Sequence, residues 1–161
     1  MTSDALCSDL IERYISTFEA GFLSDEHGGA YFCVPSAHHR RLHVHLEISP
    51  SFGDMLTIEV TPVRSFPDSD RAWLTHVADT WNRQNRDVTA LLAGACDPQR
   101  VGVVARRSWW IREDVVSKDA AFEAFASLVD RTVAAAIDLF DELAPSFAEP
   151  AAALALLRDA G

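Results

Sequence analysis

The sequence predicts an α+β protein with an antiparallel five-stranded sheet and flanking helices, in the order α-β-β-β-α-β-β-α plus a short C-terminal helix. Two patterns support this prediction. Apolar residues recur at helical spacing over Ser117–Leu143, whereas Leu42–Ile48 and Leu56–Val60 alternate apolar and polar residues as strands do. The 161 residues suffice for a single domain, in which residues 148–161 form a short helical tail.

The first half of the chain predicts one helix and three strands. An apolar stripe at helical spacing over Leu6–Phe18 indicates the helix. The aromatic run Ala30–Val34 reads as a strand that ends at Pro35. The two alternating segments, Leu42–Ile48 and Leu56–Val60, should pair as a hairpin whose apolar residues share one face.

The second half predicts a helix, two strands and the long helix. Phe66–Asp70 has the composition of a turn, and a helical face then continues to about Arg86. Val88–Leu92 is a weak strand pattern, because alanine and glycine have low strand propensity, and Val101–Ile111 is a stronger one.

The long helix has the clearest apolar stripe in the sequence. Ser117 is suited to cap its first turn, and Pro145 prevents the helix from continuing. The stripe should pack on the apolar face of the hairpin. Its members are Phe122, Phe125, Ala126, Val129, Val133, Ala136, Ile137 and Phe140.

Charge and composition favour a cytoplasmic protein that binds neither nucleic acid nor membranes. The formal net charge of −10 repels phosphate backbones and anionic lipid. No uncharged apolar stretch reaches the ~18–20 residues that cross a bilayer. Asp4 and Asp9 stand where a signal peptide would carry a basic start and an apolar run.

The sequence shows no sign of catalysis or of a cofactor. Nucleophile elbow, Walker, dinucleotide-binding and H-E-x-x-H motifs are missing from it. Cys7, Cys33 and Cys96 lie far apart and form no C-x-x-C pair, so they are interpreted as buried or incidental thiols. We therefore expect a protein that is not an enzyme and carries no cofactor.

A histidine-rich strand is the one candidate for metal binding. Alternation places His43, His45 and Glu47 on one face, and Glu59 could approach from the neighbouring strand. An open sheet face does not enclose an ion, so a solvated or interfacial polar face is the preferred interpretation. Metal binding remains the alternative.

Two adjacent tryptophans predict a contact surface. Since strand alternation turns Trp109 and Trp110 to opposite faces, one of them must point away from the core. We expect this to be Trp110, near Arg106 and Arg112, a composition typical of protein–protein contacts. Cover of Trp110 by the C-terminal tail is the alternative.

Three short motifs carry a family resemblance. They are W-N-R-Q-N at Trp81–Asn85, E-D-V-V at Glu113–Val116 and F-E-A-F-A-S-L-V-D at Phe122–Asp130. With the element order, they make the stretch from Trp73 to Leu143 resemble the YbjN-like family of bacteria, within the type III secretion chaperone-like fold.

This resemblance implies a function that the residues alone do not reveal. In the resembled fold, a homodimer presents surfaces along which segments of a client protein wrap. The expected function is therefore a non-enzymatic, chaperone-like or regulatory module that captures a protein partner as a homodimer. The client is not identified by the sequence. The alternative is a metal-binding or metal-dependent protein that uses His43, His45 and a nearby carboxylate.

Overall fold

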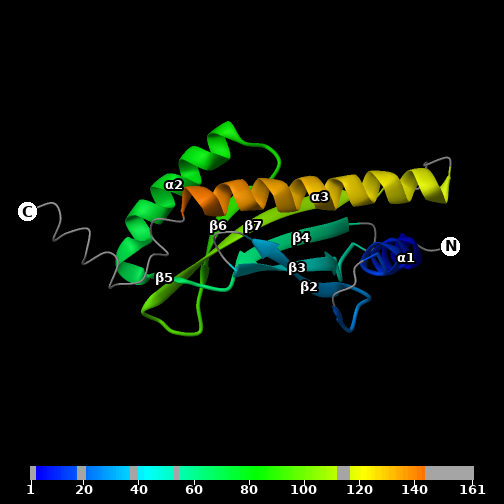
Figure 1. Ribbon diagram of the computed structural model, residues 1–161, viewed down its shortest axis with the longest axis horizontal. Coiled ribbons are helices and arrows are strands. Elements are labelled where there is room, and N and C mark those ends of the chain that lie inside the picture. Colours follow the sequence, from blue (N-terminus) through cyan, green and yellow to red (C-terminus); the bar gives the residue numbers. More distant parts are fainter. Residues whose placement is uncertain (1–2, 18–20, 37–39, 53–54, 112–116, 144–161) are drawn as a thin grey trace, which may run out of the picture.

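The computed structural model describes residues 3–17, 21–36, 40–52, 55–111 and 117–143. They form one antiparallel sheet of seven strands and three α-helices (Figure 1). The strands are β1 (Leu23–Ser24), β2 (Ala30–Ser36), β3 (Arg40–Ile48), β4 (Met55–Pro62), β5 (Phe66–Pro67), β6 (Thr89–Gly94) and β7 (Arg100–Trp110).

The strands lie side by side in the order β1-β2-β3-β4-β7-β6. β5 pairs with β7 on the same edge as β4, because Val101 of β7 pairs with Phe66 of β5 on one side and with Gly94 of β6 on the other. β7 therefore pairs with three strands, β4 and β5 on one side and β6 on the other.

The sheet has seven strands rather than the predicted five, because two strands of two residues add to it. β5 falls in the stretch Phe66–Asp70 that the sequence predicts as a turn, and β1 lies beside a turn-rich segment. Two residues are too few to show strand alternation, so the sequence pattern does not reveal them.

Pro35 lies inside β2 and does not end it, contrary to the prediction. Among the described strands, β1 pairs only with Ala30 and Tyr31 of β2. Pro35 therefore lies on an open edge, where a residue without an N–H group is tolerated.

The three described helices agree in order with the first three of the predicted helices. They are α1 (Ser3–Ile15), α2 (Arg71–Gln84) and α3 (Lys118–Glu142), and a short 3-10 turn, η1 (Asp68–Asp70), precedes α2. Ser117 caps α3 as predicted, since its Oγ accepts a hydrogen bond from the N–H of Ala120 at 3.1 Å.

The predicted hairpin is confirmed, with its apolar residues on one face. In the β3–β4 register Leu46 pairs with Ile58, and Val44 pairs with Val60. α3 runs along this inner face and contacts β4 and β7 (Figure 1). The apolar residues that the two strands bury are Leu42, Val44, Leu46, Ile48, Leu56, Ile58 and Val60.

The buried stripe of α3 is rotated from the predicted one. Phe122, Ala126, Val133 and Ile137 are only partly buried. Apolar residues cover a broad arc of α3, of which the sheet buries one part, and α1 lies beside the other part. Arg13 of α1 places its guanidinium 4.1 Å from the centre of the Phe122 ring. The residues that α3 buries are Ala121, Phe125, Leu128, Val129, Thr132, Ala136, Leu139 and Phe140.

The W-N-R-Q-N motif attaches the end of α2 to β6. The indole N–H of Trp81 donates to the carbonyl of Val88 at 3.2 Å. Asn82 donates to the carbonyl of Ala90 at 3.0 Å and accepts from its N–H at 2.7 Å. Asn85 donates to the carbonyl of Trp81, which closes the helix as a terminal asparagine can. These residues therefore serve the fold.

Three sequence predictions lie outside the described residues: the helical tail at 148–161, the connection Glu113–Val116, and Arg112. In the part of the chain that is described, no helix combines the length and apolar character needed to span a bilayer.

Candidate protein-binding surface

The outer face of the sheet, opposite α3, is the surface on which the predicted site residues lie. The three helices contribute their buried side chains to one core on the inner face. Outward-pointing residues of β3, β4 and β7 therefore reach solvent, as strand alternation requires.

Three apolar side chains lie together on this face, here called the Trp110 patch: the exposed Phe52 and Trp110 and the partly buried Met55. Trp110 is 52% exposed and Phe52 is 53% exposed. Their rings meet edge to face with centroids 5.5 Å apart, and Met55 is the cross-strand partner of Trp110. The patch therefore presents a large aromatic surface without a charged group among its members.

The turn between β3 and β4 holds Phe52 in this position. The hydroxyl of Ser49 accepts hydrogen bonds from the N–H groups of Ser51 and Phe52, at 3.3 and 3.2 Å. The N–H of Ser49 donates to the carbonyl of Met55 at 2.9 Å, and the N–H of Met55 donates to that of Phe52 at 3.0 Å. Hydrogen bonds from the Ser49 side chain and the turn backbone thus fix Phe52 beside the indole.

Trp109 points the other way, as alternation predicts. It is partly buried against the core, with its ring centroid 6.4 Å from that of Phe125 on α3. The two adjacent indoles therefore have different physical roles, one in packing and one at the surface.

Arg106, the predicted neighbour of Trp110, is occupied by an ion pair. Its Nε and Nη2 atoms lie 2.8 and 2.7 Å from Oε1 of Glu59, its cross-strand partner. An exposed pair of this kind contributes at most about 1 kcal/mol to stability, so it chiefly fixes the orientation of the guanidinium.

The histidine face does not assemble the predicted alternative metal site. Glu47 pairs across the strands with Thr57, and Glu59 is held by Arg106. His45 stacks on Tyr31, with ring centroids 3.9 Å apart and planes 6° apart. Across the described residues, no three histidine, cysteine, aspartate or glutamate side chains lie close enough to hold a metal ion.

Asp25 is the partner of His45, with Oδ2 lying 3.3 Å from Nε2. Its Oδ1 atom accepts from the N–H groups of Gly29 and His27, at 2.7 and 2.8 Å. A side chain at Gly29 would collide with this carboxylate and with the carbonyl of Leu46, so glycine is required there. Asp25 therefore joins the β1–β2 turn to β3.

The pKa of the Asp25 carboxyl is lowered from its ordinary value. Desolvation is the largest single influence and would raise this pKa, but the hydrogen bonds from Gly29, His27 and His45 together outweigh it. Because the folded pKa is the lower one, the carboxylate stabilises the fold fully above its unfolded pKa of about 4. The contribution disappears as the pH falls through the folded pKa.

We expect Asp25→Asn to lower the free energy of unfolding at pH 7 by about 1–3 kcal/mol, the range for a hydrogen-bonded charged group. The difference from wild type should shrink as the pH falls from about 4 through the folded pKa, below which the native carboxylate is itself protonated. Denaturant unfolding at the two pH values measures this. Glu26→Gln, an exposed carboxylate one residue away, is the control, and an identical pH dependence in both variants would contradict the assignment.

Sequence reasoning missed Phe52, Tyr31 and Asp25. Phe52 lies in a loop whose position depends on the β4–β7 register, which no local pattern encodes. Tyr31 could have been placed on the outer face by its alternation with the buried Phe32. For Asp25, the spacing D-x-x-x-G was the available signal, since aspartate often accepts from N–H groups of its own turn.

Comparison with solved structures places the fold. YbjN from E. coli, a candidate transcription regulator, superposes with a TM-score of 0.58 at 12% identity, over 82% of this chain and 86% of YbjN. The ExsC–ExsE complex gives a match with a TM-score of 0.49 at 16% identity, over 82% of this chain and 92% of that one. No family profile and no curated protein matches the sequence.

The structural class that the sequence resemblance implies is thereby confirmed at the level of the fold. The chain shares the fold of YbjN, and it is similar to ExsC over the same share of its length. The fold assignment rests on YbjN, the stronger of the two superpositions.

Proposed function

We propose that this protein is a single-domain, non-enzymatic binding module of the bacterial cytoplasm, with a chaperone-like or regulatory role, that captures a protein partner as a homodimer. The observation that carries the proposal is the Trp110 patch. Two aromatic side chains, each about half exposed, stand together on a sheet face that no described helix covers.

Physical chemistry favours a protein as the partner of this patch. Full burial of a large apolar side chain stabilises by about 1.5–3 kcal/mol, and since each ring is already about half buried, roughly half of this is still to be gained. Tryptophan and arginine are enriched among the residues that dominate binding energy, and the Arg106–Glu59 pair lies on the same face as a polar border. The chain's net charge of −10 disfavours nucleic acid or anionic lipid in the same role.

The fold supports the proposal without identifying the partner. YbjN is a candidate regulator, which fits a module that acts by binding. The histidine face offers no comparable observation, so the metal-binding alternative is not carried forward.

We expect Trp110→Ala to reduce recovery of the specific partner in affinity capture from the native host by at least about tenfold. A tenfold loss corresponds to roughly 1.4 kcal/mol of binding free energy, the size of effect expected for an energetically important contact. Quantitative mass spectrometry compares it with wild type and with Ser108→Ala, an exposed neighbour on the same face. Partners recovered equally by all three proteins would show that neither the Trp110 patch nor a dimer formed through it is needed for capture.

A further inference from the structure

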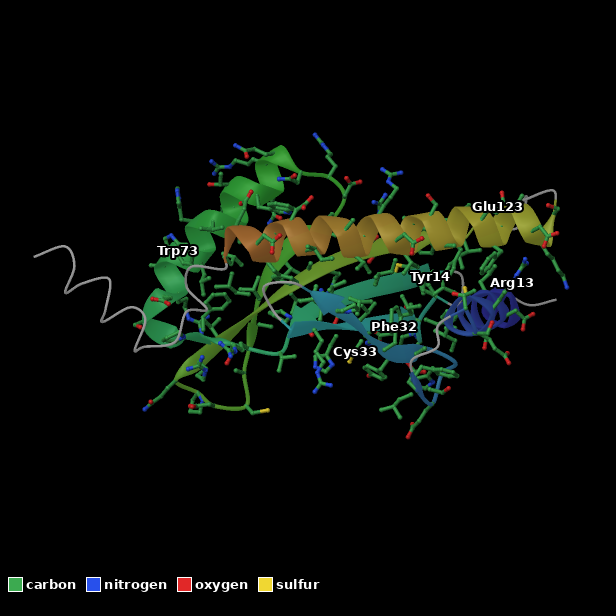
Figure 2. All side chains as sticks on the ribbon, in the orientation of Figure 1. Arg13, Tyr14, Phe32, Cys33, Trp73 and Glu123 are labelled. Carbon is green, nitrogen blue, oxygen red and sulfur yellow. The ribbon has the colours of Figure 1, made fainter. Side chains whose placement is uncertain are left out.

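Cys33 and His43 form a thiol–imidazole pair on the outer face of the sheet, away from the Trp110 patch. They are direct cross-strand partners on β2 and β3, with Sγ 3.5 Å from Nδ1. Cys33 follows the buried Phe32 on β2 and points to the opposite face of the sheet (Figure 2). The thiol is half-buried and forms no disulfide.

A pocket of about 360 Å³ opens at this pair, beside the edge formed by β1 and β2. Its walls are mostly apolar, and the exposed Phe22 and Leu23 form its outer rim. Its volume is at the lower end of the range for small-molecule sites. The lining residues are Gly21, Phe22, Leu23, Tyr31, Phe32, Cys33, His43 and Val44.

A second, more polar hollow of about 410 Å³ lies next to the first. The two share Tyr31, His43 and Val44, and the second adds His45, Glu59 and Thr61. Thr61 is the partner of His43 on β4, so a thiol, an imidazole and a hydroxyl form one row across three strands. A ligand with an apolar tail and a polar head would match this pair of hollows.

We propose that Cys33 is a covalent modification site for apolar electrophiles of the α,β-unsaturated aldehyde class, with His43 as the base. The hydrocarbon tail occupies the apolar pocket, and the carbonyl oxygen lies on the side of the polar hollow and Thr61. This assignment is independent of the proposed function, because Cys33 and His43 lie on β2 and β3, whereas the Trp110 patch lies on β4, β7 and the β3–β4 turn.

The reaction is a conjugate addition. His43 Nδ1, unprotonated in the required tautomer, accepts the thiol proton as sulfur attacks the β-carbon of the aldehyde. The carbon–sulfur bond forms, the carbon–carbon π bond breaks, and its electrons form an enolate. The imidazolium returns the proton to the α-carbon. The addition therefore balances without an oxidant, a reductant or a leaving group.

The other two cysteines make the site testable within one protein. Cys96 is exposed but lies on the β6–β7 turn, and Cys7 is fully buried in the core. If exposure alone governed the reaction, Cys96 would react faster than the half-buried Cys33. A faster reaction at Cys33 would instead indicate help from the imidazole and the pocket.

The experiment treats the full chain with nonenal, a long-chain enal, and with acrolein, its shortest relative, and follows each cysteine by peptide mass spectrometry. With nonenal, Cys33 should react at least about tenfold faster than Cys96, a modest share of what a positioned base can contribute. With acrolein this ratio should fall, because the short reagent does not fill the pocket. Cys7 should stay unmodified, which reports that the fold is intact.

Two variants separate the base from the pocket. His43→Gln should slow Cys33 at least about tenfold with both reagents and leave Cys96 unchanged. Leu23→Ser, at a pocket residue that is 73% exposed, should lower the ratio for nonenal alone. A Cys96 rate equal to or above that of Cys33 with nonenal would overturn the proposal, as would a His43→Gln variant that reacts like wild type. If His43→Gln makes Cys7 reactive, that variant has lost its fold, and Leu23→Ser provides the test instead. A Cys33-to-Cys96 rate ratio with nonenal that is unchanged in Leu23→Ser would then overturn the proposal.

Discussion

Leu46→Asp or Ile58→Asp is expected to unfold the protein. The two side chains face each other across β3 and β4, and each is 0% exposed. An aspartate at Leu46 would bury a carboxylate among apolar side chains beneath α3, because its cross-strand partners are Ala30 and Ile58. At Ile58 the partner on β7 is Arg107, whose guanidinium already pairs with Asp87. Burial of an unpaired charge belongs to the small class of changes that cost more than about 4–5 kcal/mol, which is comparable to the whole stability of many domains.

Circular dichroism during thermal unfolding measures the effect, with Ser108→Asp as the control. This change introduces the same carboxylate on the exposed outer face of the same sheet, so its effect should stay within about 0.5 kcal/mol. A Leu46→Asp protein with the melting temperature of wild type would show that the apolar face of β3 and β4 does not form the core.

The adjacent tryptophans should give opposite phenotypes. Trp109→Ala should lower the free energy of unfolding by about 3 kcal/mol, near the low end for a tryptophan because the ring is only partly buried against Phe125. Trp110→Ala should leave stability of the folded chain nearly unchanged and convert a dimer to a monomer, because its ring contributes to the surface and not to the core.

We expect Trp110→Ala to dissociate the dimer because the dimer is symmetric. In an isologous contact, the same patch is buried once on each subunit, so a single indole contributes twice to the interface. Removal of Trp110 therefore removes two large side chains, together with the edge-to-face contact that each makes with Phe52. Equal phenotypes for Trp109→Ala and Trp110→Ala would contradict the assignment of the two rings to different faces.

Elements with a long, regular pattern could be predicted from the sequence. The hairpin follows from alternation that continues through both β3 and β4, and α3 from an apolar repeat with Ser117 as its cap. These patterns are local, so they also place Trp109 and Trp110 on opposite faces.

Features that depend on tertiary contacts could not be predicted. The rotation of the α3 stripe follows from where α1 lies beside Phe122, and β5 exists only because β7 is next to it. On the candidate surface, the Arg106–Glu59 pair and the approach of Phe52 to Trp110 both require the β4–β7 register. The apolar and polar pattern of one strand does not reveal which distant strand it pairs with or in which register.

Sedimentation equilibrium at micromolar concentration tests the central claim, that this chain is a homodimer whose contact surface includes Trp110. The wild-type protein is predicted to sediment at twice the 17.7 kDa mass of the chain, and Trp110→Ala at the mass of one chain. A wild-type monomer would contradict the claim outright. A dimer that persists in Trp110→Ala would show that the interface lies on another surface.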